Sequence, residues 1–320
     1  FLNISRFSYL VSKLNYLFLF SAIQSLSFVL VANLLLGVRG TILLHWLVMF
    51  TTACCGNLIG LNISAGMKSA VSIYILIPFI LVPQLLLGGA MIRFDELHRS
   101  VSKMEHVPIV GDMMPLRWSY EALSVGQFRD NKYEKPFFEH EMGASQNDWY
   151  ASFLVPTLEV YVDECLYAGK QPEYSDNVNS NLAKLNHHIP ELASLSAIET
   201  GNWFGNLNYE SFDSLTAKLT KEYLGTLKSH FRQEEKRYIA QRESVYNDLV
   251  ASMGTEKLVE LKANYHNEQL ASIVLNRLSV SRIYEAEDKL IQKATPIFMS
   301  PTSKNGRSHF FAPYKRLAFL

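Results

Sequence analysis

The residues best placed for chemistry are two opposite charges, Arg117 and Glu121, in a segment otherwise rich in apolar and aromatic residues. Pro115 can open a helix there, because its ring presets the helical backbone angle. Residues four apart share one face of a helix, so Arg117 and Glu121 can form an ion pair. Trp118 and Phe128 are aromatic side chains of the kind found at a bilayer interface. We therefore predict a short helix that lies in, or dips into, the edge of a membrane.

Motifs for catalysis or for holding a cofactor are absent. The sequence contains neither a Gly-x-x-x-x-Gly-Lys-Ser/Thr phosphate loop nor a Gly-x-Ser-x-Gly nucleophile elbow. His187 and His188 could offer two metal ligands, but we find no partner ligand at suitable spacing and interpret them as a loop pair. Glu139-His140-Glu141 lacks the second histidine of a zinc-binding helix. We expect no catalytic residue, cofactor or metal in this chain, which is not an enzyme by itself.

Charge and cysteine content argue against a nucleic-acid-binding protein and against a disulfide-stabilised domain. The 30 basic and 30 acidic residues balance, and the run 232–237 mixes both signs, which indicates a solvated helix surface rather than a nucleic-acid site. Cys54 and Cys55 lie inside an apolar stretch, and Cys165 stands alone in the polar part. No disulfide framework is expected from three cysteines so placed.

Charged residues are nearly missing from the first part of the chain. Three charge-free stretches, 14–38, 40–67 and 69–92, each hold roughly 20 or more residues, enough to cross about 30 Å of hydrocarbon. A charge at the centre of such a helix costs about 3 kcal/mol, so the gap has an energetic meaning. The alternative is a set of buried helices in a soluble core, but such helices show a polar face. We predict three transmembrane helices within residues 14–92.

The third stretch contains four residues that disturb a helix: Pro78, Pro83, Gly88 and Gly89. Each proline removes a backbone donor and crowds the carbonyl one turn earlier, so we predict a kinked helix. Kinks suit a transporter that changes shape, although static membrane bundles contain them too.

A few polar residues interrupt the apolar stretches. They could line a substrate path, or they could form hydrogen bonds between neighbouring helices, which is the interpretation we favour. We place His45 near the end of its helix, where it would reach the interface. The set comprises Asn15, Gln24, Asn33, His45, Asn57 and Gln84.

Residues 133–295 are polar and helix-rich, and we predict a water-soluble region. Apolar residues recur every four positions from Leu215 to Phe231, which indicates an amphipathic helix that continues to about Val250. Gly254 is suited to end it, and a second helix over 258–274 would complete an antiparallel helical hairpin. A further helix is expected over 147–168, interrupted near Pro156.

The order Arg117-Trp118-x-x-Glu121-Ala122-Leu123, closing with Gln127-Phe128, resembles a signature in permease domains of the eye-pigment, or G, subfamily of ABC transporters. The stretch 7–14 looks like that family's intracellular loop before its third helix, and Gly37 and the Gly88-Gly89 pair also agree. The resemblance covers residues 4–130. The long loop that follows departs from most members and looks like bacterial forms that carry an insertion before the last helix.

This resemblance implies an all-α polytopic membrane protein with five parts. Residues 1–13 would be a cytoplasmic loop or interfacial helix, 14–92 three transmembrane helices, and 93–132 a re-entrant segment on the outer side. Residues 133–295 would be an extracytoplasmic helical insertion, and 296–320 would lead to a final helix beyond Leu320. Because the chain begins with Phe1 and stops in an apolar tail, we expect a fragment of a longer protein.

The expected function is that of the permease part of an ATP-driven transporter in the cell membrane. The resemblance implies an ABC nucleotide-binding domain that holds ATP and Mg²⁺, a second permease half in a homo- or heterodimer, and contact with lipid; nucleic acid is not an expected partner. The alternative is a membrane-anchored sensor or assembly protein, whose soluble hairpin binds a partner. The substrate and the direction of transport do not follow from the sequence.

Overall fold

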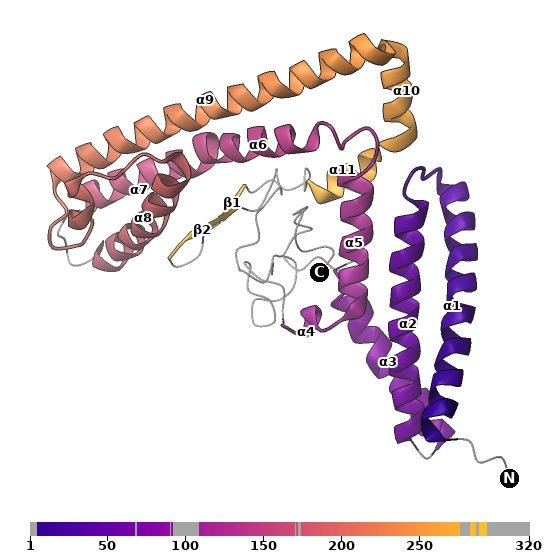
Figure 1. Ribbon diagram of the computed structural model, residues 1–320. Helices are drawn as coiled ribbons and strands as arrows, with labels where there is room; N and C mark the ends of the chain where they lie inside the picture. The colour runs from indigo at the N-terminus through magenta and orange to yellow at the C-terminus, as the bar shows by residue number, and fades with distance from the viewer. Residues whose placement is uncertain are drawn as a thin grey trace. The chain divides into compact units, whose positions relative to one another are not determined.

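The computed structural model describes residues 5–67, 69–89, 91, 109–169, 171, 174–275, 282–285 and 288–292. These residues fold into two compact units, each described by itself below. The first unit comprises the described residues within Phe1–Lys135 and Thr255–Ala271, and the second comprises those within Pro136–Gly254 and Ser272–Met299. Figure 1 shows the chain coloured from its N-terminus to its C-terminus.

Helices α1 (Arg6–Leu36) and α2 (Ile42–Gly66) lie side by side in the first unit (Figure 1). Ser5 caps the start of α1 by accepting a hydrogen bond from the N–H of Ser8 at 3.1 Å, and α1 ends at Gly37 with φ +66°.

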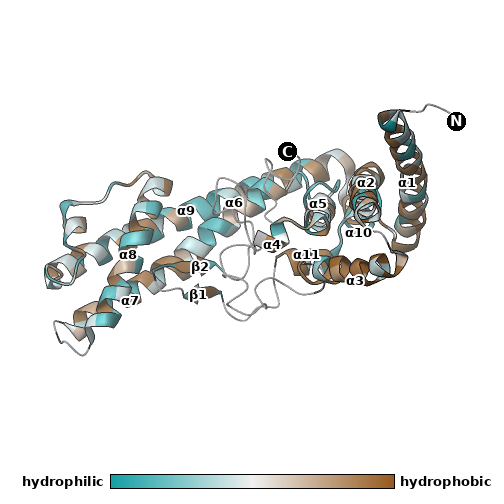
Figure 2. Cartoon of the chain, turned by 90° about the horizontal axis from the view of Figure 1, so that it is seen from below, coloured by the Kyte–Doolittle hydropathy of each residue, from teal (hydrophilic) through white to brown (hydrophobic). Residues whose placement is uncertain are grey.

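Both helices are long and apolar enough to cross a membrane. Only 22% of the most apolar window of α1 and 11% of that of α2 is buried, whereas a core helix of a soluble protein is mostly buried. Figure 2 shows brown hydrophobic residues over α2 and α3 and predominantly teal polar residues on α9. The outward apolar surface of α1 and α2 therefore favours a lipid environment.

The third apolar helix, α3 (Ala70–Leu86), is shorter than the stretch predicted to cross the membrane. It continues through Pro78 and Pro83 and ends where the N–H of Leu87 donates to the carbonyl of Pro83 at 2.8 Å. Gly89 follows with φ +75°, a conformation that ends helices. At 17 residues, α3 reaches about 26 Å, slightly less than the hydrocarbon core of about 30 Å. A third full crossing therefore stays a prediction.

The first unit continues with three more helices. The single turn α4 (Ile109–Asp112) precedes α5 (Pro115–Arg129), which packs against α2 and α3. Helix α10 (Thr255–Tyr265) also belongs to this unit and is followed by α11 (Glu268–Val274).

The second unit begins with one long helical run. It consists of α6 (Phe138–Trp149), a π-helical turn (Tyr150–Leu154) and α7 (Val155–Ala168). The π turn is the interruption predicted near Pro156: the N–H of Val155 donates to the carbonyl of Tyr150, five residues earlier. Pro156 has no N–H to continue the ordinary ladder at this point. The run starts nine residues earlier than predicted, at Phe138 rather than at residue 147.

Helix α9 (Ser214–Met253) runs antiparallel to α6 and α7. Ion pairs step along the interface: Arg242 contacts Glu141 at 2.7 Å, Arg232 contacts Asp148 at 3.4 Å, and Lys228 contacts Glu159 at 3.3 Å. Asp213 caps the start of α9 by accepting from the N–H of Thr216 at 2.7 Å.

The predicted hairpin had the wrong second arm. The expected helix over 258–274 is divided into α10 and α11, because Asn267 starts a new helix: its side chain accepts from the N–H of Leu270 at 3.0 Å. Helix α10 moreover belongs to the first unit, whereas α9 belongs to the second. The long antiparallel partner of α9 is the run Phe138–Ala168.

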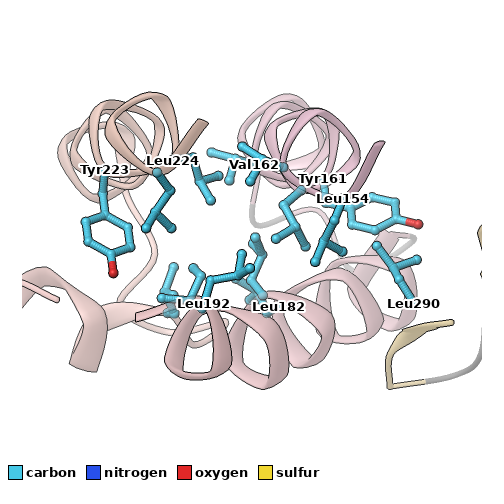
Figure 3. Packing of buried hydrophobic residues seen from close by; sticks show 14 of the residues in the cluster. Leu154, Tyr161, Val162, Leu182, Leu192, Tyr223, Leu224 and Leu290 are labelled. Carbon is cyan, nitrogen blue, oxygen red and sulfur yellow. The ribbon is translucent and has the colours of Figure 1, made fainter. Parts of the chain in front are cut away.

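The core of the second unit lies between α7, α8 (Ser175–Ser196) and α9 (Figure 3). Leu158, Leu185, Ile189 and Leu192 are all 0% exposed in this core. A short 3₁₀ segment (Asn202–Asn206) and Tyr223, whose hydroxyl donates to the carbonyl of Ile198 at 2.8 Å, close one side. Burial of this apolar surface is the main stabilising contribution to the unit.

The sequence led us to expect a purely helical fold, but the described residues also include two short strands. Strands β1 (Ile283–Glu285) and β2 (Leu290–Gln292) form an antiparallel pair in which Glu285 lies opposite Leu290. Leu290 is buried and joins the core of the second unit (Figure 3). Strands of three residues are too short to leave a periodic signal in the sequence.

Candidate functional site

The candidate site lies at the start of α5, where Pro115 occupies the first turn as predicted. The helix presents one face to α2 in antiparallel order: the hydroxyls of Ser119 and Thr52 are hydrogen-bonded, and Gly126 lies against Leu44. A Cβ at Gly126 would come within 2.2 Å of Leu44 Cδ2, so a larger residue would force that side chain to move. The first turns of α5 therefore lie beside the middle of α2.

Arg117 is the centre of the site. Its side chain is 3% exposed, and its Nη2 lies 3.2 Å from Oε2 of Glu121, which is the ion pair predicted from the spacing. Its Nη1 lies 3.3 Å from Oδ1 of Asp112, a partner that the sequence analysis missed. The guanidinium carbon stacks 4.1 Å from the ring centroid of Trp118, and the indole N–H of Trp118 donates to the carbonyl of Asp112 at 2.8 Å.

Charge attraction within this cluster holds the side chains of Arg117, Asp112 and Glu121 together. One buried guanidinium faces two carboxylates, so Arg117 can balance only one full negative charge. Removing one partner from a buried ion pair leaves an uncompensated charge, which costs about 3–5 kcal/mol. Within the described part of the chain, neither Nε nor Nη1 of Arg117 has a hydrogen-bond partner, so the contact of Nη1 with Asp112 is an ion pair without hydrogen-bond geometry. The arrangement offers no nucleophile or metal cage; its chemistry is to fix α4, the turn after it and α5 together.

Two groups of residues that the sequence singled out separately meet here. A Cβ at Gly88, beyond the end of α3, would lie 3.5 Å from Leu116 Cδ2 in α5 and 2.6 Å from the carbonyl oxygen of Gln84. Glycine therefore allows the end of the proline-containing helix to rest on the residue next to Arg117. The residue after the end of α3 and the first turn of α5 therefore lie close together.

The aromatic residues of the motif have different environments. Trp118 is 40% exposed, which suits the predicted position at an interface. Phe128 is buried at 3% exposure in the first unit, so it serves packing and not an interfacial belt. The sequence could not distinguish the two, because both are aromatic residues on a short helix.

Polar residues between α1 and α2 form a seam. Nδ1 of His45 donates to Oδ1 of Asn33 at 3.2 Å, and Nδ2 of Asn57 donates to Oγ of Ser21 at 2.8 Å. This confirms hydrogen bonding between helices for these residues. His45 lies near the start of α2, as predicted, but its side chain is 9% exposed and is directed to Asn33; its position at the membrane interface stays a prediction.

We predicted that the histidine pair lies in a loop, but the structure places it on α8 together with Glu191. The ligand atoms of His187, His188 and Glu191 lie within 4.8 Å of one another, so the sequence analysis overlooked a carboxylate at helical spacing. However, Nε2 of His188 accepts the N–H of Leu290 at 2.8 Å, and Nδ1 donates to Glu191 at 3.3 Å. Binding a metal at Nδ1 would require a proton on Nε2, opposite the N–H of Leu290. The geometry therefore fits a structural histidine better than a metal ligand.

Burial also favours a structural role for His188. His188 is 4% exposed and both of its ring nitrogens are engaged, which ties α8 to strand β2. The hydrogen bond from His188 lowers the pKa of Glu191.

Comparison with known proteins finds a family match over the first part of the chain. Residues 1–128 match the model of the ABC-2 type transporter family. No curated protein and no solved structure matches the chain. The ABC-2 match supports a membrane-embedded permease component of an ABC transporter. It ends at Phe128, so the ABC-2 region contains the whole Arg117 cluster and leaves out the helical second unit.

Proposed function

We propose that the chain is the permease part of an ATP-driven transporter of the ABC-2 type, and that it belongs to the eye-pigment, or G, subfamily. The observation that carries the proposal is the ABC-2 match over residues 1–128, which coincides with the helices whose apolar side chains face outward. An ABC nucleotide-binding domain would hold ATP and Mg²⁺ and supply the energy. A second permease half would complete the path across the cell membrane.

In this proposal the Arg117 cluster holds a re-entrant element at the outer gate. Ser119 contacts Thr52 within α2, so the cluster lies at a depth that α2 crosses. Ionisable residues at such depth are costly and are retained mainly at functional positions. The contact of Gly88 with Leu116 would pass a bend at Pro78 or Pro83 on to Arg117.

The second unit is proposed to lie outside the cytoplasm. The chain enters it directly after α5, at the end of α5 that lies near the α1–α2 loop, because Gly126 rests on Leu44. If residues 1–13 lie in the cytoplasm, one crossing by α1 places that loop on the opposite side.

The experiment is to purify the full-length transporter with its nucleotide-binding domain and reconstitute it into lipid nanodiscs. We expect the chain to co-purify with Mg²⁺-dependent ATP hydrolysis. In intact cells, with Cys54, Cys55 and Cys165 replaced by alanine, a membrane-impermeant maleimide should label Tyr167→Cys and not Lys13→Cys. Purification without ATPase activity would contradict transport, and labelling of Lys13→Cys alone would reverse the topology. The first outcome would favour a membrane-anchored sensor.

A further inference from the structure

The base of the helical insertion is a small cluster within the first unit. The segment that follows α5, residues 131–134, meets the segment that joins α10 to α11, residues 265–268. Both segments belong to the first unit, and each precedes a point at which the chain passes into the second unit, at Pro136 and at Ser272. Contacts between them therefore join the two points at which the chain leaves the first unit.

Asn131 fixes the first segment. Its side-chain amide donates to the carbonyl of Phe128 at 2.7 Å, and its Oδ1 accepts from the N–H groups of Tyr133 at 3.0 Å and Glu134 at 2.8 Å. This turn places the carboxylate of Glu134 in the interior, where the residue is 3% exposed. A carboxylate buried to this extent requires a nearby cation or hydrogen bonds.

His266 supplies that cation from the second segment. Its Nδ1 lies 3.4 Å from Oε2 of Glu134, and its Nε2 lies 3.3 Å from Oε2 of Glu268. The ring meets the edge of Tyr133 at 5.6 Å between centroids, and the His266 side chain is 11% exposed. A histidine between two carboxylates can satisfy both only when both ring nitrogens carry protons.

Tyr265 extends the cluster to the spans. Nζ of Lys132 donates to its hydroxyl at 3.2 Å. On the other side, its ring lies against Gly40 in the α1–α2 loop, where an added Cβ would come within 3.0 Å of Cε1. Gly40 has φ +86°, so glycine is favoured there both by conformation and by space.

We propose that Glu134, His266 and Glu268 form a pH-sensitive clamp, which ties the base of the insertion to the α1–α2 loop while His266 is protonated. The charged groups around the ring are Glu134 after α5, Glu268 at the start of α11 and Lys262 on α10. The close side chain of Glu134, opposed by burial, gives a net rise in the pKa of His266. The clamp is then complete below the ordinary histidine pKa of about 6.5 and weakens as the pH rises through the raised value.

The clamp is independent of ATP-driven transport, and it would serve a membrane-anchored sensor equally well. A rise of pH on the side of the insertion would weaken the clamp and loosen the contact between Tyr265 and Gly40 in the α1–α2 loop.

The test is hydrogen exchange of the full-length protein in nanodiscs across pH 6 to 9, corrected for intrinsic exchange rates. Peptides covering 129–135 and 262–268 should lose about fivefold in protection as the pH rises, the upper range measured for exposed ion pairs and a conservative figure for one in which Glu134 is buried. In His266→Gln the protection should be low and independent of pH. His187→Gln, which changes an exposed histidine on α8, is the matched control and should behave as the wild type.

A milder variant covers the possibility that His266→Gln disturbs folding. Glu268 is 65% exposed, so Glu268→Gln should leave the fold intact and move the midpoint of the transition to lower pH. Protection that does not change with pH in the wild type would overturn the proposal. So would a transition that persists in His266→Gln, or a midpoint that Glu268→Gln leaves unmoved.

Discussion

Arg117 Nη2 lies 3.2 Å from Oε2 of Glu121, one helical turn further along α5, and both side chains are more than four-fifths buried. The same guanidinium contacts Asp112 at the end of α4, so a single cation links α4 to α5. Arg117 therefore pairs with Glu121 inside the motif and with Asp112 outside α5. For this reason Arg117 is the residue on which the site depends most.

Arg117→Ala should destabilise the first unit by about 3–5 kcal/mol, because it leaves Asp112 and Glu121 buried without a counter-charge. Arg117→Lys should recover part of this loss, since lysine keeps the charge but lacks the planar fork that reaches two carboxylates. Thermal unfolding of the full-length protein in detergent would measure both. Arg6→Ala, at an exposed position, is the control and should change stability by less than about 0.5 kcal/mol. Equal melting temperatures for Arg117→Ala and Arg6→Ala would refute the assignment.

The polar seam between α1 and α2 should contribute modestly to the free energy of unfolding. Replacing His45 by leucine removes the bond to Asn33, and such bonds inside membrane proteins contribute about 0.6 kcal/mol on average and about 1.7 kcal/mol at most. A double-mutant cycle with Asn33→Leu, read from unfolding midpoints, isolates the pair. A coupling free energy near zero would mean that the two side chains act separately.

The second unit should depend on its apolar core far more than on the ion pairs along α9. Leu224→Ala removes a side chain that is 0% exposed and should cost about 2–5 kcal/mol. Arg232→Ala removes a half-exposed pair with Asp148 and should cost about 1 kcal/mol or less. Leu215→Ala is the matched control, because Leu215 is 63% exposed. Denaturant unfolding compares the three, and a larger loss for Arg232→Ala than for Leu224→Ala would be inconsistent with this core.

Cys165 should be unreactive in the folded protein. It is 1% exposed, and burial raises the pKa of its thiol to about 12, so the thiolate is scarce near neutral pH. In a Cys54→Ala, Cys55→Ala background, maleimide labelling at pH 7.5 should therefore proceed only as fast as the second unit opens. Rapid labelling without denaturant would show that the thiol is accessible.

Zinc should not stabilise the second unit through His187, His188 and Glu191, since His188 already uses both ring nitrogens. The measurement is the unfolding temperature with and without micromolar Zn²⁺. A rise of several degrees that His188→Ala removes would establish a metal site at these residues.

The sequence was most informative where a local pattern determines the structure. The helical face shared by Arg117 and Glu121, the start of α5 at Pro115 and the length of α1 and α2 all follow from spacing and composition. Asp112 was missed because it precedes the helix, so no periodicity links it to Arg117. Glu191 was missed because the histidines were assigned to a loop, and helical spacing was then not considered.

Contacts between distant segments were beyond the reach of such patterns. An amphipathic face on α9 shows that the helix has a partner but does not say which one, and the nearest helix in sequence was the wrong choice. His266 likewise had no signal of its own, because Glu134 lies far away in the chain and only the fold brings them together.

The central claim is that residues 1–128 form a permease in which nucleotide binding rearranges the Arg117 cluster. The most direct measurement is hydrogen exchange at residues 109–121 of the full-length transporter in nanodiscs, without nucleotide and with Mg-ATP and vanadate. We predict a change in exchange at these residues, and no change when the ATPase domain carries a substitution of its phosphate-loop lysine. Identical exchange in both states, in a preparation that hydrolyses ATP, would contradict the account.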